Sequence, residues 1–340
     1  MVKKRRGGRN NIVSAVKRAK VKRSKTLEKI LCRQQALFAK SECLEEAFFM
    51  IDHSIDAHDR FVHYTTLPRL AQKVESKRWW LTRSDSDCLN DVQEAKKFGN
   101  PELLCRMYQS SFSYGTGAES AAMWGLYCHG DPLGVMISLS GVAMREWFEE
   151  IRFKKSEVCL EYTKATAKHG RHVKLAKKQI EFADARDVIY AATDFANNSV
   201  RLKNRKTRSH ILRWFDTRTK KIENLAQEIN VKKFTGWIKD AEWWQENESR
   251  IAVRVKNVDG ELPLNISVNI PDSVLKSMIV TLSPWLKAEQ YDEISAKIRT
   301  LVRGLHDGTV PSHIVSPSVL TGALESWRIR YSGYAKGGLS

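Results

Sequence analysis

Hydrophobic residues near the start of the chain follow a helical repeat. From Ile30 to Ile51 a large aliphatic residue returns every seven positions, with further leucine and phenylalanine residues beside this row. A repeat of this kind marks one face of an amphipathic helix. We therefore expect residues 26–58 to form a helical N-terminal extension. Its apolar face would dock on the rest of this chain or on a partner.

From residue 59 the pattern changes to short apolar runs between turns. Alternating and β-branched runs predict strands at 61–65, 79–82, 134–139, 153–162, 188–191, 247–255, 262–270 and 278–282. Helical spacing predicts helices at 67–76, 101–110, 118–128 and 285–305. The dipeptide Asp259-Gly260 predicts a hairpin between two of the strands. Strands and helices mix without strict alternation, so we expect an α+β domain over 59–305, followed by a C-terminal segment over 306–340.

Composition narrows the class of protein. The 340 residues include ten Trp, twelve Phe and nine Tyr, which exclude a wholly disordered chain because they can bury a large core. No run approaches the roughly 18 apolar residues of a membrane-spanning helix, so no membrane partner is expected. The six Cys are scattered without a Cys-x-x-Cys pair. This argues against a zinc ribbon or a secreted disulfide framework, and favours a reducing cytoplasm.

Charge adds the strongest constraint on partners. The chain carries 57 Lys and Arg against 39 Asp and Glu, a net charge of +18. Residues 1–25 hold eleven basic residues and no acid, which predicts a flexible basic arm. A second basic cluster spans 201–221, within a polar stretch over about 195–230 that we interpret as a helical insertion.

Polyanions attract such clusters through counterion release, and nucleic acid is the commonest polyanion in the cytoplasm. A nucleic-acid partner is therefore favoured, with a solubilising tail or an acidic protein partner as the alternatives. The candidate nucleic-acid contacts are Lys3, Lys4, Arg5, Arg6, Arg205, Lys206 and Arg208.

Standard catalytic fingerprints are missing from the sequence. There is no phosphate-binding glycine loop, no dinucleotide-binding glycine motif, no zinc-hydrolase motif and no nucleophile-elbow motif. Side chains at metal-ligand spacing are missing as well, so no metal is expected.

Two local clusters have the side chains to bind a polar ligand. On a strand, His63 and Thr65 share one face and Tyr64 takes the other, so the first pair can bond a ligand together. The alternative is a half-buried strand with an internally satisfied histidine. Asn90 and Asp91 form the second cluster, which suits either a ligand or simple capping of a helix N-terminus.

A third cluster contains two acids and an arginine at alternate positions. Glu246, Glu248 and Arg250 share one face of the predicted strand, and Arg250 can form a bidentate pair with one carboxylate. The other carboxylate is then free to stabilise a developing cation. A salt-bridged surface ladder is the alternative. Two adjacent acids that follow Trp243 and Trp244 favour a cleft instead.

Several sequence elements in a fixed order point to a known family. They are FVHYTTLPRLAQKVESKRWWLT (61–82), LNDVQE (89–94), SFS (111–113), MWGLYCHGDPLGVMISL (123–139), DVIYA (187–191) and the spaced set Lys239, Trp243, Glu246, Glu248 and Arg250. Together they resemble family 2971 of the domains of unknown function, across residues 60–300. That family is similar to the ADP-ribosyltransferases.

The resemblance implies a split antiparallel sheet that grips NAD, as substrate, in a cleft. His63 would contact the adenosine-side ribose, with Thr65 beside it, and Glu248 would bond the nicotinamide ribose. Ser113 or Tyr127 would support the nicotinamide end. Tyr64 stands where polymerase-type members carry glycine.

The chemistry of glycosidic cleavage agrees with these roles. Breaking the nicotinamide–ribose bond gives an oxocarbenium-like centre and a neutral leaving group, so one carboxylate is the main catalytic demand. Glu246 would orient or deprotonate the acceptor. Arg250 would hold the two acids apart or grip a pyrophosphate.

The leading hypothesis is an NAD-dependent ADP-ribosyltransferase that modifies RNA or DNA, as a bacterial toxin or antiphage defence effector. Such a toxin would need a restraining antitoxin or chaperone partner. The alternatives are a non-catalytic nucleic-acid-binding module, an NAD hydrolase, and a magnesium-dependent nuclease that uses Asp91, Glu94, Glu246 and Glu248.

Overall fold

The computed structural model describes residues 58–86, 101–115, 119–162, 172–191, 210–216, 221–229, 236–240, 243, 246–256 and 261–324. Several predictions concern residues outside these ranges, and they stay predictions. They are the arm over 1–25, the helix over 26–57 and the contacts at Asn90, Asp91, Arg205, Lys206 and Arg208.

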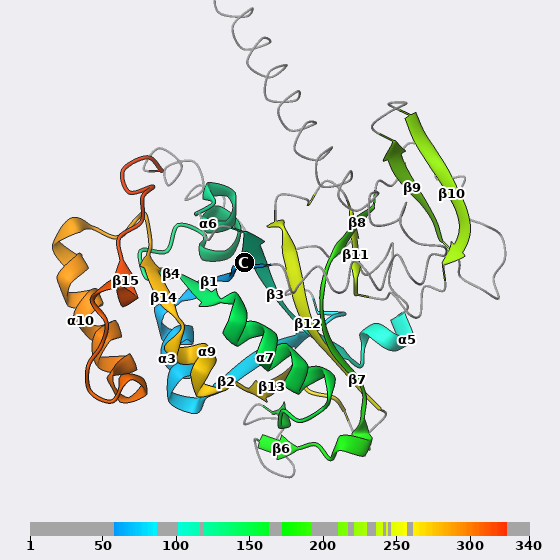
Figure 1. Ribbon diagram of the computed structural model, residues 1–340, viewed down its shortest axis with the longest axis horizontal. Helices are drawn as coiled ribbons and strands as arrows, with labels where there is room; N and C mark the ends of the chain where they lie inside the picture. Colours follow the sequence, from blue (N-terminus) through cyan, green and yellow to red (C-terminus); the bar gives the residue numbers. More distant parts are fainter. Residues whose placement is uncertain are drawn as a thin grey trace, which may run out of the picture.

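An eleven-stranded sheet forms the centre of the molecule (Figure 1). Its strands are β1 (Arg60–Thr66), β2 (Arg78–Arg83), β3 (Met107–Gly115), β4 (Gly134–Ser140), β5 (Val158–Glu161), β6 (His172–Lys174), β7 (Ile180–Asp187), β12 (Glu248–Val255), β13 (Asn265–Asn269), β14 (Ile279–Leu282) and β15 (Val315–Ser316). Neighbouring strands pair antiparallel, except that β14 and β15 are parallel. Strands and helices mix as the sequence predicts, so the α+β class is confirmed.

The sheet forks at β3. On one side β3 pairs along its length with β12, which in turn pairs with β7. On the other side its two ends pair with different strands. Val62 of β1 lies opposite Ser113, whereas Thr82 of β2 lies opposite Gln109. The stretch 110–112 lies between these two pairings, so β1 and β2 diverge from β3 like the arms of a fork.

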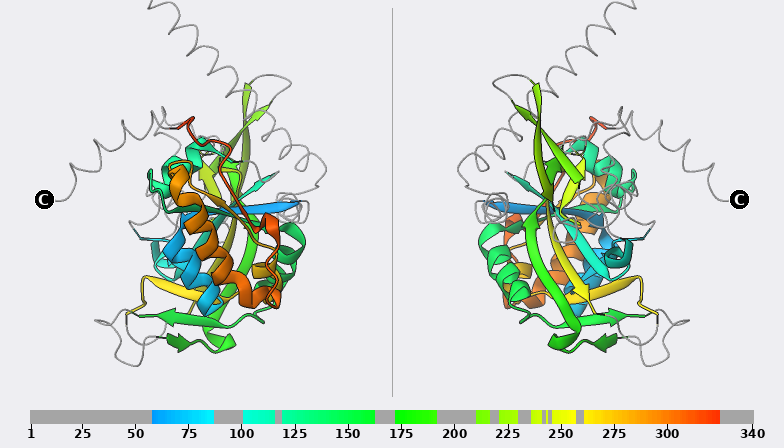
Figure 2. Two further views of the ribbon diagram at one scale, coloured as in Figure 1. Left: turned by 90° about the vertical axis from the view of Figure 1, so that its left-hand side faces the viewer. Right: turned by 90° about the vertical axis from the view of Figure 1, so that its right-hand side faces the viewer.

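Helices cover the two faces of the sheet unequally. The larger core lies against α3 (Leu67–Ser76), α7 (Gly141–Arg152), α9 (Asp272–Lys276) and α10 (Tyr291–Val302). Figure 1 shows α7 and α9 in front of the sheet, and the side views of Figure 2 show α10 beside α3. A smaller core on the other face packs α6 (Ala121–Cys128) against Val62, Tyr64 and Met136.

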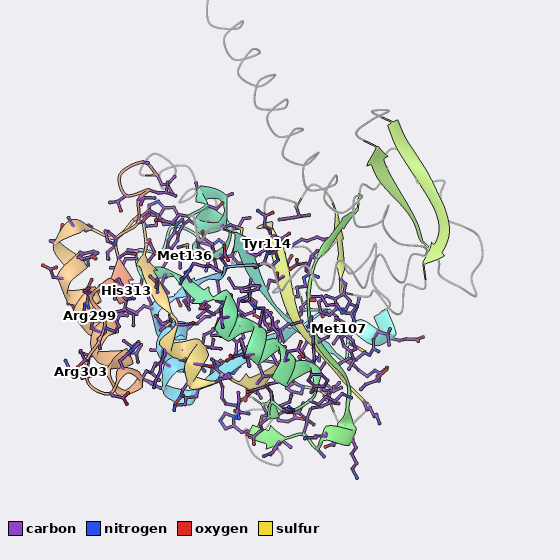
Figure 3. All side chains as sticks on the ribbon, in the orientation of Figure 1. Met107, Tyr114, Met136, Arg299, Arg303 and His313 are labelled. Atoms are coloured by element: carbon purple, nitrogen blue, oxygen red, sulfur yellow. The ribbon has the colours of Figure 1, made fainter. Side chains whose placement is uncertain are left out.

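Side chains fill the space between the sheet and these helices (Figure 3). Phe61 and Trp147 belong to the larger core and are fully buried, as is Trp124 in the smaller one. Arg299 lies at the outer edge, where its guanidinium donates to the carbonyl oxygens of Pro311 and Ser312. These bonds tie α10 to the segment that leads into β15.

The predicted helix over 101–110 is wrong beyond its first turn. Helix α5 covers only Pro101–Leu104, and β3 begins at Met107. Alternation in β3 is hard to see because Ser110, Ser111 and Ser113 break the apolar pattern. Tertiary pairing decides the conformation, since β3 is hydrogen-bonded on both sides.

The predicted hairpin between 247–255 and 262–270 is also wrong. Strand β12 lies between β3 and β7, whereas β13 lies between β2 and β5. A tight turn allows two strands that are close in sequence to pair, but burial of their side chains decides which strands become neighbours in the sheet. Val253 and Val268 are both fully buried, in separate parts of the same core.

The helical interpretation of 195–230 is contradicted by its described residues. β9 (His210–Asp216) and β10 (Lys221–Ile229) form an antiparallel hairpin. It projects beyond a second small sheet, in which β8 (Ile189–Ala191) runs parallel to β11 (Ile238–Asp240) (Figures 1 and 2). The sequence of β9 is rich in residues with high strand propensity, and pairing across the turn outweighs the helical spacing in β10.

One further prediction needs a correction of bounds. Residues 153–157 close α7 and form a turn, so only Val158–Glu161 of the strand predicted over 153–162 is extended. Within the described residues, no helix is long and apolar enough to cross a membrane.

Candidate active site

A small cleft that is open to solvent lies beside the fork of the sheet. Strands β1, β3 and β12 and helix α6 contribute its walls. It is lined by Val62, His63, Tyr64, Ser111, Phe112, Ser113, Met123, Tyr127, Glu246 and Glu248. Six of these residues are ones that the sequence singles out as candidates, although they come from four distant parts of the chain.

His63 fills the gap between the arms of the fork. Its Nδ1 lies 3.1 Å from the carbonyl oxygen of Ser111, in the stretch of β3 that faces neither arm. Because a carbonyl only accepts hydrogen bonds, Nδ1 carries the proton, and Nε2 keeps a lone pair. The ring packs edge-on against Trp79, 4.7 Å between centroids.

Burial and the positive charge of Lys73 lower the pKa of His63 to about 3. The imidazole is therefore neutral at physiological pH. In this tautomer Nε2 is a hydrogen-bond acceptor that a ligand hydroxyl can use.

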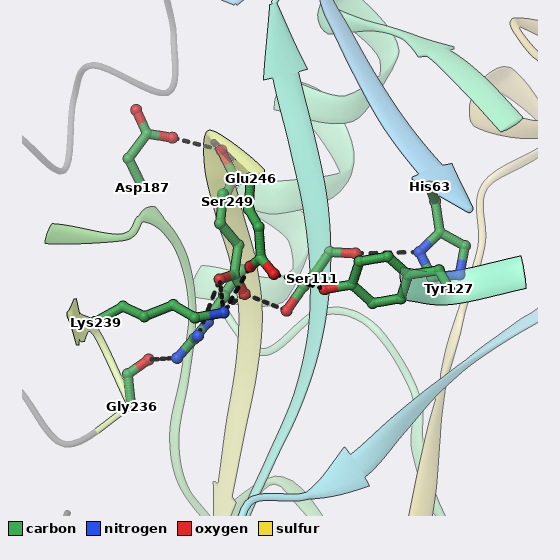
Figure 4. A network of polar contacts seen from close by, with 10 residues as sticks. His63, Ser111, Tyr127, Asp187, Gly236, Lys239, Glu246 and Ser249 are labelled. Atoms are coloured by element: carbon green, nitrogen blue, oxygen red, sulfur yellow. Dashed lines mark hydrogen bonds and ion pairs between the residues drawn. The ribbon is translucent and has the colours of Figure 1, made fainter. Parts of the chain in front are cut away.

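Two carboxylates and two cations form a buried quartet next to the cleft. Its members are Lys239, Glu246, Glu248 and Arg250. The Lys239 ammonium lies 2.6 Å from Glu246 Oε2 and 3.2 Å from Glu248 Oε2 (Figure 4). All four residues are at most 3% exposed.

Arg250 forms the predicted bidentate pair. Its Nε donates to Glu248 Oε1 at 2.5 Å and its Nη2 to Oε2 at 3.0 Å, while Nη1 donates to the Gly236 carbonyl at 2.7 Å. The side chain is 2% exposed and does not line the cleft. Arg250 therefore orients Glu248 from within the protein and is not placed to grip a pyrophosphate in the cleft. The acid that it leaves without an arginine is Glu246, and Lys239 pairs with both acids, so the expectation that one carboxylate stays free of a cation is wrong.

A left-handed residue brings the two acids together. Strand β12 begins at Glu248, so Glu246 lies in a 3₁₀-helical turn before it and not on the strand face expected from the sequence. Asn247 between them has φ +43°, a region that asparagine adopts more readily than most residues. The turn directs both carboxylates at one ammonium.

The environment separates the acidities of the two glutamates. Burial raises the pKa of Glu246 to about 7, helped by the negative charge of Glu248 and opposed by Lys239. Burial acts in the same direction on Glu248, but Arg250 and Lys239 outweigh it and hold the pKa of that carboxyl far below its usual range. At neutral pH Glu248 is an anion, and Glu246 is poised to exchange a proton.

Hydroxyl groups complete the cleft wall. Ser111 donates a short hydrogen bond to Glu248 Oε1, and the Tyr127 hydroxyl lies 3.4 Å from Glu246 Oε1. Ser113 lies directly opposite Glu248 in the pairing of β3 with β12. The Tyr64 hydroxyl accepts a bond from the Ser120 amide, which ties β1 to the start of α6.

A second buried contact supports β12 from behind. Ser249 donates to Asp187 Oδ1 at 2.5 Å, and Asp187 Oδ2 lies 2.7 Å from His58 Nε2. The His58 ring stacks on Tyr114, with centroids 3.8 Å apart. Consecutive residues of β12 are thus fixed on both of its faces.

The structure differs from the sequence candidates at a few positions. Thr65 is buried and does not line the cleft; its carbonyl accepts from the Cys128 thiol. Sequence reasoning did not assign Ser111 or Lys239 to the site, although both lie in the motifs that carry the resemblance. Their spacing in the sequence could have identified them. Ser111 is two residues before Ser113, and Lys239 is seven residues before Glu246.

The lining has a distinctive chemical character. Among the residues described, its charged groups are carboxyls, and neither lysine nor arginine lines it. Aromatic, hydroxyl and thioether groups make up most of the remaining wall. Within the described ranges, no three His, Cys, Asp or Glu side chains are grouped so that they could hold a metal.

Glu248 presents its carboxylate to a cleft with aromatic walls, while Lys239 and Arg250 balance its charge from behind. Comparison of the chain with family models, curated proteins and solved structures finds no match. What the site can do therefore follows from its own geometry.

Proposed function

We propose that the protein is an NAD-dependent ADP-ribosyltransferase whose cleft takes the nicotinamide–ribose end of NAD. One observation carries this proposal: an ionised Glu248, fixed by Arg250 and Ser111, faces a small cleft with no cation in its described lining. That wall matches a positively charged pyridinium ring and the ribose attached to it. It does not suit a phosphate group.

The cleft is small and open to solvent, so we assign it only the nicotinamide–ribose half of NAD and place the pyrophosphate and adenosine outside it. His63 Nε2 is placed to accept a hydrogen bond from a ribose hydroxyl at its edge.

The reaction needs few groups. The bond between the nicotinamide nitrogen and ribose C1′ breaks, and its electron pair stays on nicotinamide, which leaves as a neutral molecule. Glu248 stabilises the positive charge that develops on the ribose ring. The acceptor then forms a bond to C1′ and gives its proton to Glu246, whose pKa of about 7 suits a group that takes up a proton near neutral pH.

The acceptor class rests on the sequence alone. A net charge of +18 and the basic segments 1–25 and 201–221 favour a nucleic-acid acceptor. A toxin or defence role with a restraining protein partner belongs to the same proposal. Its docking surface would be the amphipathic segment 26–58.

A transfer assay tests the proposal. The full chain is mixed with NAD that carries a label on the adenosine half, and with RNA, DNA or lysate protein in separate tubes, in the presence of a chelator. Glu248→Gln is the test variant. Glu293→Gln is the control, because Glu293 is an exposed glutamate on α10 whose partner is Lys297.

Label on one acceptor class, lost only in Glu248→Gln, is the expected result. Consumption of NAD without transfer of label would make the protein an NAD hydrolase. If neither protein consumes NAD and both bind nucleic acid in a salt-dependent way, the enzymatic proposal is wrong and the binding module replaces it.

A further inference from the structure

Lys239 occupies the space between the two carboxylates. It comes from β11, which joins the rest of the fold through a parallel pairing with β8. Its ammonium bonds Glu246 at 2.6 Å and Glu248 at 3.2 Å, and lies 4.8 Å from the centre of the Trp243 ring. A buried lysine held by two acids and an aromatic face has little freedom to move.

The two cations of the quartet are not equivalent. Arg250 directs its guanidinium at Glu248 and at the Gly236 carbonyl. Among the described residues Glu246 forms an ion pair with Lys239 alone. Without Lys239, Glu246 would lie beside the anionic Glu248 with no ion-pair partner among the described residues, and the two carboxyls would titrate as a coupled pair because their negative charges repel in a medium of low dielectric.

We propose that Lys239 is a positioning residue, which keeps the two carboxyls from sharing a proton and so gives them separate tasks. Glu248 stays anionic for the donor ribose, and Glu246 keeps its own proton equilibrium for the acceptor. The catalytic tasks assigned here rest on the proposed function. The effect of Lys239 on the protonation of the two carboxyls does not depend on it.

Other groups near Glu246 must be considered in any pH measurement. They are Glu248 and Arg250 of β12, Tyr127 of α6, His63 of β1 and Lys239 of β11. His63 is already neutral above about pH 3 and does not change charge between pH 5 and 9. A transition near neutrality therefore belongs to the carboxyl pair.

A titration that does not depend on enzyme activity tests the inference. The full chain is labelled with ¹³C at glutamate carboxyls, and resonances are assigned with Glu246→Gln and Glu248→Gln. In the unaltered protein we expect one carboxyl to titrate near neutral pH while the other stays ionised. Coincident transitions of both resonances in the unaltered protein would already overturn the inference, with no need for a variant.

Lys239→Gln is the main variant, and Lys73→Gln is its matched control. Lys73 is also a buried lysine that lies over a tryptophan, 4.8 Å from the Trp79 centre, but it bonds neither carboxylate. In Lys239→Gln we expect the Glu246 midpoint to rise by about one pH unit or more and both resonances to report both transitions. Unchanged midpoints in Lys239→Gln would overturn the inference.

Kinetics separate positioning from a purely structural role. In Lys239→Gln we expect kcat for NAD consumption near pH 7 to fall about tenfold, with its acidic limb moved to higher pH and KM for NAD little changed. Lys239→Arg, which restores the charge, should recover most of the original pH profile. A uniform loss with an unmoved profile in both variants would contradict the inference. If the unaltered protein consumes no NAD, the proposed function fails while the titration still decides the role of Lys239.

Discussion

Two clusters in this molecule contain similar side chains but differ in their exposure to water. The buried quartet holds two glutamates with a lysine and an arginine, all at most 3% exposed. An edge cluster on β2, β5 and β6 holds two glutamates with three basic residues: Arg78, Glu157, Glu161, His172 and Lys174. There His172 and Lys174 are 65% and 69% exposed.

Water decides what each cluster can do. In the edge cluster the two acids share Arg78, and each has a further, exposed basic partner in Lys174 or His172. The pKa of Glu157 is lowered through its hydrogen bond with Lys174. Solvent screens these pairs, so they contribute little to stability. In the quartet, burial raises the pKa of both carboxyls, but Arg250 and Lys239 outweigh it at Glu248, so the two pKa values move in opposite directions. The sequence spacing of acidic and basic residues is enough to find a charged cluster. Burial from water is what shifts its pKa values and makes it a candidate active site.

The largest difference between the clusters should follow the loss of one arginine. Arg250→Met leaves Glu248 buried with one cation instead of two, and we expect a loss of about 3–5 kcal/mol in the free energy of unfolding. Arg78→Met leaves its acids with Lys174 and His172, and because Arg78 is 16% exposed and also bonds Ser267 and Asn269 we expect a smaller but measurable loss of about 1–2 kcal/mol. Urea unfolding at neutral pH measures both. Equal losses of unfolding free energy in the two variants would show that burial does not distinguish the two clusters.

The pH dependence of stability should reveal Glu246. Its pKa is about 7 in the folded state and near 4.5 in the unfolded chain, so the folded state holds the proton more tightly. The unfolding free energy therefore falls as pH rises from about 4.5 to about 7, by about 3 kcal/mol in total. Glu246→Gln should remove this slope. Glu248 acts in the opposite sense and only below that window, since its pKa is lowered.

Unfolding curves measured every half pH unit test this expectation. Glu157→Gln in the edge cluster serves as the control, because it leaves Glu246 unchanged. A slope that survives in Glu246→Gln would assign it to another group.

Loss of the Ser111 hydroxyl should have a moderate effect. Its hydrogen bond reaches an ionised carboxylate, and such bonds contribute about 1.5–3 kcal/mol. We expect Ser111→Ala to lower NAD consumption about tenfold, with the fold intact by circular dichroism. Ser110→Ala is the matched control: its hydroxyl accepts from Trp79 Nε1 and does not bond Glu248. Equal effects of the two variants would show that Ser111 acts through packing.

The smallest effect should come from the exposed cation of the edge cluster. Lys174→Met removes a partner of Glu157 that is 69% exposed, and we expect a change below about 1 kcal/mol. High salt should cancel even that, because solvent ions screen the pair. A loss comparable to that of Arg250→Met would mean that exposure does not separate the two clusters.

Local pattern was sufficient for most strands and for part of the site. Runs of apolar and β-branched residues located β1 and β4, alternation located β12, and the spacing of polar side chains singled out His63 and Glu248. It failed for β3, whose serines interrupt the apolar alternation. It also failed for the pairing of β12 and β13, which depends on contacts far apart in the sequence.

The quartet shows the same limit. The bond between Arg250 and Glu248 is local and was predictable from period two. The role of Lys239 was not, because its position depends on the pairing of β11 with β8. Strand geometry alone also placed Glu246 wrongly, since it lies in a turn.

The left-handed turn at Asn247 has a consequence for the divergence of this protein. A β-branched residue there would meet a steric cost at φ +43°, while asparagine, aspartate or glycine would not. Chains that keep the paired acids should therefore carry one of these three residues between them. A chain with valine or isoleucine at that position would have lost the shared ammonium contact, even with both glutamates retained. The middle residue, which has no part in the chemistry, is then the better marker for recognising functional descendants.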